Sequence, residues 1–353
     1  MRLRSMAASA TRVYARVMPT PCKRFPLRRV APTRLLAAVA AVLAGLAMGM
    51  APAAVFAFDV QGHRGARGLA PENTMAAFRI ALSHGVDTLE TDMAVTRDDV
   101  IVLAHDPRLN PALVRGPDGR WVDPPGVPIR ALDLAQLRRH DIGRLRPDSD
   151  YARQWPAQQA ADGERFPTLQ ELFDQVRSQP REVRLNLETK ITPTSGEEVV
   201  TPTRFAQLVA QAVQVSGMQD RITIQSFDWR TLLELKRLAP AIATACLTSE
   251  TERFNTVRPG PEGASPWHAG LRAADHGGSL PALVKAAGCG TWSMFWRDLT
   301  PERVRQAQAL GLKVLPWTVN EPADMKRLIE WGVDGIITDY PDRLRALVPR
   351  VSP

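Results

Sequence analysis

From residue 58 onward, short runs of β-branched residues alternate with longer amphipathic stretches. Short β-branched runs between turn residues are typical of strands, and longer stretches with a helical apolar period are typical of helices. Their regular alternation predicts parallel β/α units and disfavours a sandwich or a helical bundle. We expect eight main strands, at residues 58–62, 86–93, 183–187, 222–225, 242–247, 290–294, 313–317 and 335–338.

The expected helices lie between these strands, at residues 73–83, 169–177, 202–215, 229–238, 301–310 and 323–331. Two of them have clear start signals, because Thr168 precedes Glu171 by three residues and Thr300 precedes Pro301. Eight strands with intervening helices predict an α/β fold, a TIM (β/α)8 barrel. An open doubly wound sheet is the competing architecture, but no GxGxxG motif follows the first strand.

Two connections are longer than a plain barrel needs. Residues 106–167 form an insertion after the second strand, and residues 248–279 form another long connection; both are rich in Pro, Arg, Asp and Gly. Long inserts on such a scaffold usually cover a site. A short additional strand at residues 100–104 is expected to return toward the same end of the barrel before the insertion begins.

The positive charge of the chain is confined to its first 57 residues. The formal net charge is +8, but nine of the 45 Lys and Arg residues lie there, with no Asp or Glu. From residue 58 onward, 36 basic residues face 37 acidic ones, so the remainder has a net charge of −1. We therefore expect no nucleic-acid partner.

Residues 1–57 have the layout of a signal peptide. Basic residues run to Arg34, and an uncharged apolar run follows. Small side chains near Ala57 predict cleavage there, which leaves residues 58–353 as an exported domain, periplasmic or secreted, with no stable membrane insertion. The alternative is an uncleaved signal that anchors the protein, since the apolar run could span a bilayer.

Only three cysteines are present, and two of them, Cys246 and Cys289, lie beyond the leader. This count excludes a disulfide-dense scaffold. Outside the cytoplasm a disulfide between the two is chemically allowed. Two separate buried thiols are the alternative.

Acidic residues alternate along two of the expected strands. In the second main strand, Glu90 and Asp92 point to one side because side chains alternate across a strand. The third main strand leads into Glu188 and Lys190, which also share a side. Carboxylates this close repel one another unless a cation lies between them. Such oxygen ligands suit one divalent cation, Ca²⁺ or Mg²⁺, better than zinc.

Two imidazoles are expected at the same end of the barrel. The first main strand ends at His63, followed by Arg64, and the short strand at residues 100–104 delivers His105. Two histidines beside a cation fit transfer at a phosphate ester, because one ring removes a proton from the nucleophile and the other protonates the leaving alkoxide. Arg64 and Lys190 supply further positive charge for the phosphoryl group.

An ordered set of motifs extends this pattern over residues 61–342. Its parts are His63-Arg64-Gly65, Glu72-Asn73-Thr74, Glu90-x-Asp92, Thr96-x-Asp98, His105-Asp106, Asn186-x-Glu188-x-Lys190, Gln225-Ser226-Phe227, Trp317-Thr318-Val319-Asn320 and Thr338-Asp339-Tyr340-Pro341-Asp342. As an ordered set, these motifs resemble the glycerophosphodiester phosphodiesterases. Residues 106–167 resemble the insertion of the longer, exported members of that family.

The resemblance implies a TIM barrel with three kinds of site residue. The metal ligands would be Glu90, Asp92 and Glu188, and the acid/base pair would be His63 and His105. Arg64 and Lys190 would contact the phosphate, and Gln225 and Trp317 would line the glycerol side, as an amide partner and an apolar wall. The implied reaction is hydrolysis of glycerophosphodiesters, the deacylated remnants of phospholipids, to glycerol 3-phosphate and an alcohol. The nucleophile is either water or the glycerol 2-hydroxyl acting through a cyclic phosphate.

Two other functions fit parts of the same pattern. A phospholipase-like or sphingomyelinase-D-like phosphodiesterase acts on lipids that retain acyl chains; an accessible apolar rim would favour it, and the polar, Pro-rich inserts disfavour it. A secreted protein that captures phosphodiesters without turnover needs no proton shuttle, so the paired histidines disfavour it. We therefore expect a small-molecule glycerophosphodiester as the substrate. The sequence predicts no particular oligomeric state.

Overall fold

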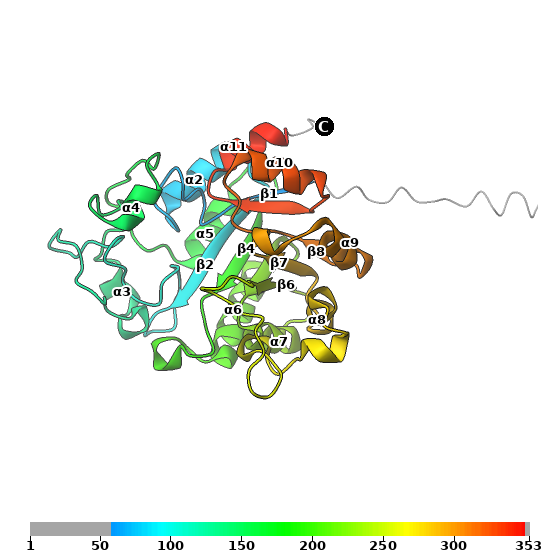
Figure 1. The fold of residues 1–353 in the computed structure, drawn as a ribbon. Coiled ribbons are helices and arrows are strands. Elements are labelled where there is room, and N and C mark those ends of the chain that lie inside the picture. Colours follow the sequence, from blue (N-terminus) through cyan, green and yellow to red (C-terminus); the bar gives the residue numbers. More distant parts are fainter. Residues whose placement is uncertain (1–57, 350–353) are drawn as a thin grey trace, which may run out of the picture. The chain divides into compact units, whose positions relative to one another are not determined.

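Eight parallel strands form the wall of a nearly closed barrel in the computed structural model, which describes residues 58–349 (Figure 1). They are β1 (Asp59–Gly62), β2 (Thr88–Val95), β4 (Arg184–Thr189), β5 (Ile222–Ser226), β6 (Ala243–Thr248), β7 (Thr291–Met294), β8 (Lys313–Val314) and β9 (Gly335–Thr338). They pair in the order β8-β7-β6-β5-β4-β2-β1-β9. Hydrogen bonds from Asp334 N to Val314 O and from Ile337 N to Pro316 O, both 3.0 Å, join the two ends of this series. The predicted TIM barrel is confirmed.

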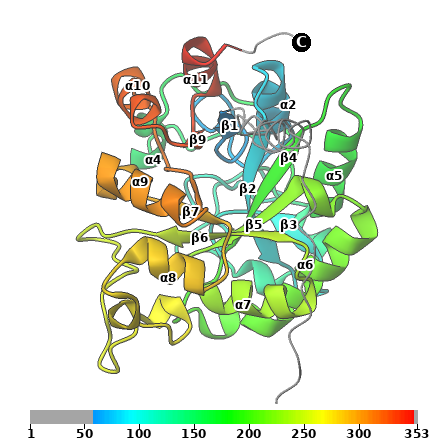
Figure 2. The same cartoon turned by 90° about the vertical axis from the view of Figure 1, so that its right-hand side faces the viewer.

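Helices surround this wall (Figure 2). They are α2 (Met75–Ser83), α5 (Leu169–Arg177), α6 (Pro202–Ser216), α7 (Trp229–Leu238), α8 (Leu280–Ala286), α9 (Pro301–Ala309), α10 (Pro322–Glu330) and α11 (Pro341–Leu347). The start signals act as expected: Thr168 forms a capping box with Glu171, and the Thr300 side chain accepts a hydrogen bond from Arg303 N. The large side chains Phe78, Phe173, Phe205, Trp229 and Trp292 are fully buried in the main core.

One strand is shorter than the sequence predicts. Residues 313–317 were expected to be extended throughout, but the β8 ladder comprises only Lys313 and Val314. Pro316 has no N–H group to donate. The residues on either side of it still bond to β7, because Leu315 N donates to Trp292 O and Trp317 N donates to Met294 O, both at 3.0 Å. Trp317 thus reaches the carboxyl end of the barrel from irregular backbone.

The insertion after the second strand has a small core of its own. The strand β3 (Ile101–Leu103) returns antiparallel to β2, and the insertion that follows contains α3 (Leu134–Leu137) and α4 (Asp150–Gln154). Buried apolar side chains join the insertion to this hairpin; they include Val102, Leu109, Ile129, Leu137 and Phe166. The insertion is therefore a packed unit beside β2, seen at the left of Figure 1.

Cys246 of β6 and Cys289, which precedes β7, form a disulfide with their Cα atoms 5.9 Å apart. Of the two alternatives that the sequence left open, the structure therefore has the bonded pair. Within residues 58–349, every helix falls short of the length and apolarity that a bilayer-spanning segment needs. The predicted signal peptide, residues 1–57, and the alternative anchor lie outside the described residues.

Candidate active site

The candidate site lies at the carboxyl ends of the barrel strands, where there is a cavity of about 190 Å³. Eight of the nine predicted site residues line it: His63, Arg64, Glu90, His105, Glu188, Lys190, Gln225 and Trp317. The ninth, Asp92, is the register partner of Glu188 across β2 and β4. The fold thus brings together side chains that the sequence separates by up to 254 positions.

Three carboxylates lie close enough to share one ion. One oxygen from each of Glu90, Asp92 and Glu188 lies within 4.8 Å of the others, and all three side chains are buried. Burial, and then the negative charges of its neighbours, raises the pKa of Glu90 well above its usual value. Burial and Asp92 also raise the pKa of Glu188. Asp92 differs, because Arg64 and Lys190 outweigh its burial and lower its pKa.

One carboxylate oxygen in this cluster lacks a hydrogen-bond donor among the described residues. The Oδ1 atom of Asp92 is buried and accepts no hydrogen bond from residues 58–349. Lys190 Nζ lies 3.7 Å away, beyond hydrogen-bond distance. A buried carboxylate oxygen without a donor is costly unless a cation binds it. Three carboxylates are the ligands that Ca²⁺ and Mg²⁺ prefer, so the residues present fit the predicted cation.

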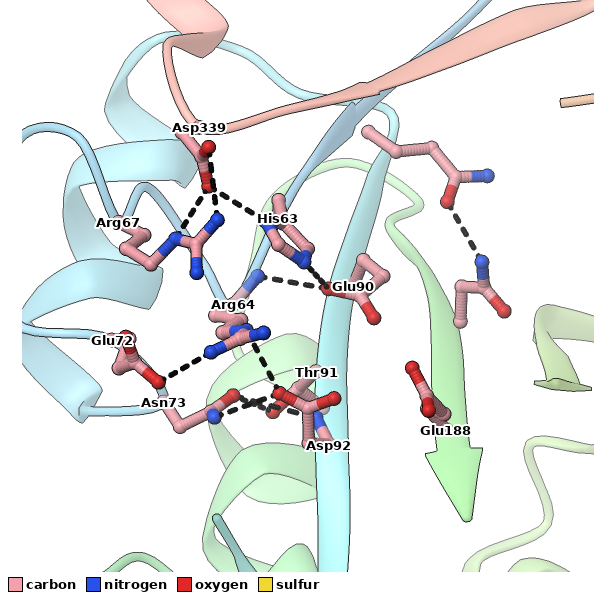
Figure 3. A network of polar contacts seen from close by, with 12 residues as sticks. His63, Arg64, Arg67, Glu72, Asn73, Glu90, Thr91, Asp92, Glu188 and Asp339 are labelled. Atoms are coloured by element: carbon pink, nitrogen blue, oxygen red, sulfur yellow. Dashed lines mark hydrogen bonds and ion pairs between the residues drawn. The ribbon is translucent and has the colours of Figure 1, made fainter. Parts of the chain in front are cut away.

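Arg64 connects these carboxylates to the loop after β1 (Figure 3). Its backbone N–H donates to Glu90 Oε2 at 2.9 Å, and its Nε lies 3.1 Å from Asp92 Oδ2. Its Nη1 donates to Glu72 Oε1 at 2.6 Å. Because Arg64 is only 7% exposed, its charge acts in a medium of low polarity and offsets much of the repulsion among the carboxylates.

The turn that aims Arg64 uses backbone conformations that side chains rarely adopt. Arg64 has a φ of 49° and Gly65 a φ of 85°. A Cβ at Gly65 would lie 2.7 Å from the backbone of Ala77, so only glycine fits between this loop and α2. The strain at Arg64, of order 1 kcal/mol, is tolerated where its backbone and guanidinium are both held by carboxylates.

His63 is oriented by a buried carboxylate. Its Nδ1 lies 2.6 Å from Asp339 Oδ1, which leaves Nε2 on the side of Glu90, at 3.9 Å from Oε2 (Figure 3). Asp339 also accepts hydrogen bonds from Arg67 and Asn320, and Arg67 lowers its pKa, outweighing its burial. Burial lowers the pKa of His63 to about 4, against the opposing effect of Asp339. The ring is therefore neutral at pH 7 and can accept a proton.

His105, like His63, is oriented by a carboxylate. Its Nδ1 lies 2.8 Å from Asp106 Oδ1, and Asp106 Oδ2 accepts a hydrogen bond from Asn110 at 2.6 Å. The surrounding protein lowers the pKa of His105, and the charges of Arg64 and Lys190 lower it further. Asp106, whose pKa falls to about 2 despite its burial, stays ionised beside the ring. Both histidines therefore pair with an ionised carboxylate.

Gln225 and Lys190 complete the polar part of the cavity. Gln225 Nε2 donates to Glu90 Oε1 at 2.8 Å, and its Oε1 accepts from Asn186 Nδ2 at 3.0 Å. Both ends of this amide are thus engaged within the protein, and its predicted contact with glycerol stays a prediction. Lys190 Nζ donates to Glu188 Oε1 at 2.7 Å.

Several residues of the site have roles that the sequence did not indicate. Asp339 and Glu72 stand in the quoted motifs, but nothing in their spacing identifies their partners. Tyr151 of α4 donates to Glu72 Oε2 and accepts from Arg67 Nη1 at 3.3 Å. The insertion therefore supports Arg64 through Glu72, a contact between residues 79 positions apart that only the folded chain reveals.

The remaining wall of the cavity is apolar. Phe227 follows β5 and Trp317 follows β8, and their rings meet edge to face with centroids 5.3 Å apart. Leu247 of β6 and Ile337 of β9 also line the cavity. Trp317 thus lies where an apolar wall was predicted.

The long connection after β6, residues 248–279, is fixed to α7 by a stacked pair of rings. His268 lies on Trp229 with centroids 4.1 Å apart and is only 2% exposed. Burial lowers the pKa of His268 to about 4. An uncharged imidazole therefore holds this connection in place at neutral pH.

A TIM barrel that gathers an acidic cluster, an arginine and two carboxylate-bound histidines at the carboxyl ends of its strands defines a hydrolase of phosphoric diesters. Residues 63–343 match the model of the glycerophosphoryl diester phosphodiesterase family. The chain therefore belongs to this family of enzymes.

Individual relatives agree with this assignment. A glycerophosphodiester phosphodiesterase of Caldanaerobacter subterraneus subsp. tengcongensis is 28% identical over 289 residues, which cover 82% of this chain and 97% of that protein. One from Bacillus subtilis is 28% identical over 286 residues, covering 79% and 83%. A crystal structure from Silicibacter pomeroyi, assigned to the same family, has a TM-score of 0.73 and 34% identity, covering 83% of this chain and 94% of that one.

The buried His268 generates a prediction about pH and stability. Its pKa is about 4 in the folded protein and 6.5 in an ordinary environment, so the unfolded chain binds a proton first as the pH falls. Between about pH 7.5 and pH 5, the wild type should lose about 2 kcal/mol more free energy of unfolding than His268→Phe, which keeps the stacked ring and cannot titrate. Urea unfolding at both pH values measures this. Equal losses in the two proteins would contradict it.

Proposed function

We propose that the protein hydrolyses glycerophosphodiesters at this cavity with one divalent cation, Ca²⁺ or Mg²⁺, held by Glu90, Asp92 and Glu188. The observation that carries the proposal is the cluster of three buried carboxylate oxygens within 4.8 Å of one another, beside two histidines. Mutual repulsion supports a cation at this point, and so does Oδ1 of Asp92, which accepts no hydrogen bond from residues 58–349. When bound, such a cation neutralises the non-bridging oxygens of the phosphate.

The side chains around the cluster have separate tasks. Arg64 and Lys190 attract the phosphate and hold it over the carboxylates. Trp317 forms the apolar wall on the glycerol side, and Gln225 orients Glu90.

His63 and His105 move the protons. One ring enters the step neutral and accepts the proton of the attacking hydroxyl at Nε2; the other enters it as the imidazolium, protonated on both nitrogens, and donates its Nε2 proton to the leaving alkoxide. Asp339 and Asp106 accept the two Nδ1–H groups and stabilise the imidazolium, which the base becomes and the acid is before it gives up its proton. The arrangement serves attack by water and attack by the glycerol 2-hydroxyl equally well.

Capture of phosphodiesters without turnover is the competing function. It would require the positive charges but neither of the two carboxylate–histidine pairs. In both histidines, Nδ1 lies less than 3 Å from a carboxylate oxygen. This arrangement therefore favours catalysis over capture.

We infer that the enzyme acts outside the cytoplasm. It has no nucleic-acid partner and no stable insertion in the membrane. The signal-peptide layout of residues 1–57 supports this, and so does the disulfide between Cys246 and Cys289, because such bonds persist in oxidising compartments. In cells that export it, the mature protein should begin near Phe58 and be recovered with periplasmic or secreted proteins. N-terminal sequencing of each fraction tests this, and a membrane-bound chain retaining its apolar leader would favour the anchored alternative.

The purified protein should release glycerol 3-phosphate from glycerophosphocholine when Ca²⁺ or Mg²⁺ is present, and EDTA should abolish the release. Glu188→Gln keeps the size of the side chain but weakens a ligand, so it should raise the metal concentration needed for half-maximal rate. An enzymatic assay of glycerol 3-phosphate across a metal titration measures both effects. An intact protein with no activity on any glycerophosphodiester would favour the capture function, and an unchanged titration for Glu188→Gln would remove Glu188 from the ligand set.

His63→Ala should lower kcat by a factor on the order of 10² or more, because an acid/base group is lost. The three carboxylates remain, so the metal affinity should stay near that of the wild type. Steady-state kinetics and a metal-binding titration on the same preparation separate the two effects. Full turnover in the variant would exclude His63 from proton transfer.

A further inference from the structure

Side chains inside the barrel form a chain of four hydrogen bonds that leads away from the cavity. Gln225 Nε2 donates to Glu90 Oε1 at 2.8 Å, and Asn186 Nδ2 donates to Gln225 Oε1 at 3.0 Å. The same Nδ2 donates to Gln61 Oε1 at 3.0 Å, and Gln61 Nε2 donates to Asp59 Oδ2 at 2.9 Å. This amide chain therefore joins a proposed cation ligand to the first residue of β1.

The links of the amide chain cross between strands that are not adjacent. Asn186 of β4 is in register with Glu90 of β2, and Gln225 of β5 reaches past β4 to Glu90. Asn186 in turn reaches past β2 to Gln61 of β1. All three amide side chains belong to residues that are at most 4% exposed. The closed barrel, and no local pattern, brings these side chains into contact.

Three amides are an unusual filling for the interior of a barrel, where branched apolar side chains dominate. A buried amide gives up its hydrogen bonds to water, so each polar atom without a partner is costly. Asn186 Oδ1 accepts no hydrogen bond from residues 58–349, and Asn186 borders a cavity of about 170 Å³ at the amino end of the barrel. The cost of this arrangement favours a role other than packing.

The two ends of the amide chain fix the direction of every amide in it. Asp59 is a carboxylate paired with a guanidinium, and Glu90 is a carboxylate whenever it holds a cation, so both ends can only accept. Gln225 and Gln61 must then turn their NH2 groups toward the carboxylates and their oxygens toward Asn186. Asn186 therefore donates both protons of its NH2 group to the two glutamines. This requirement explains why its Oδ1 has no part in the chain.

An asparagine at position 186 meets a requirement that few side chains of its size can meet. Its NH2 group has two protons, whereas the hydroxyl of Ser or Thr has one and a carboxylate has none. With fewer than two donors, at least one of the two glutamines would be free to turn. If Gln225 turned, its oxygen would face Glu90 and repel the carboxylate instead of donating to it.

We propose that Asn186 is a positioning residue for the cation site, and that it acts by holding the Gln225 amide with Nε2 toward Glu90. Gln61 and Asp59 fix the orientation of Asn186 from the amino end of the barrel. This inference rests on the proposed function and extends its cation site to residues outside the proposed ligand set. Removing a group that orients a ligand typically weakens metal binding about 10- to 100-fold.

The test is a calorimetric titration of the purified protein with Ca²⁺ and with Mg²⁺, without substrate. Asn186→Leu keeps the branched shape of the side chain and removes both donors, so it should raise the dissociation constant about 10-fold. Gln61→Met keeps the length of its side chain and leaves the bond between Asn186 and Gln225 in place. It should therefore raise the dissociation constant by a smaller factor, about 3-fold.

Thr223→Val is the matched control. Thr223 is the register partner of Asn186 on β5 and borders the same cavity, but it takes no part in the amide chain. The substitution removes a polar group next to Asn186 and keeps the shape of the side chain. The metal affinity should therefore equal that of the wild type.

A double-mutant cycle separates positioning from a general loosening of the barrel. If Asn186 acts through Gln225, Asn186→Leu should weaken metal binding in the wild type and have little further effect in Gln225→Met. Urea unfolding in EDTA establishes that each variant is folded. A purely structural role would lower the free energy of unfolding and leave the metal affinity of the folded protein unchanged.

The outcomes separate this inference from the proposed function. Unchanged metal affinity in Asn186→Leu, an equal loss in Thr223→Val, or an undiminished loss in the Gln225→Met background would each overturn the inference alone. If Asn186→Leu does not fold, unchanged affinity in Gln61→Met overturns it. A wild-type protein that binds neither ion would overturn the cation site of the proposed function itself.

Discussion

The repulsion among Glu90, Asp92 and Glu188 is the constraint on which the site depends. Three carboxylates cannot stay ionised in a closed interior unless positive charge is near. Arg64 and Lys190 supply part of it, but Oδ1 of Asp92 accepts no hydrogen bond from residues 58–349, so these two cations do not satisfy the cluster completely. A divalent cation held by these carboxylates would relieve this repulsion, so the side chains present fit the proposed cation.

The same constraint explains why distant parts of the chain converge on one loop. Arg64 offsets the carboxylates only if its guanidinium is held in place, and Glu72 holds it from one side while Asp92 holds it from the other. Glu72 is itself held by Tyr151 of the insertion. The insertion therefore supports Arg64 as well as packing on β2. Removing it would disturb the position of Arg64, although the small core of the insertion is separate from that of the barrel.

The strands, most of the helices and the nine residues that gather at the cavity could be predicted from sequence, because they depend on local periodicity and on motifs. Alternation along β2 placed Glu90 and Asp92 on one side, and the register with β4 brought Glu188 beside them. The support for these residues could not be predicted. Asp339 reaches His63 across 276 positions, and Tyr151 comes from an insertion with no regular pattern. The early end of the β8 ladder, after Val314, also departs from the strand predicted at residues 313–317.

The two aromatic residues within residues 248–279 could not be placed from composition for a related reason. The average composition of this segment is polar, and it does not indicate where the fold places the two aromatic residues that the segment contains. Phe254 and Trp267 are thirteen positions apart, and they meet because Trp267 is next to His268, which is stacked on Trp229 of α7. The charged side of the cavity, at the ends of β1, β2 and β4, is fixed by strand register. Phe254 and Trp267 are fixed by one loop and its anchor, so that loop can change while the carboxylates, Arg64 and the two histidines stay in place.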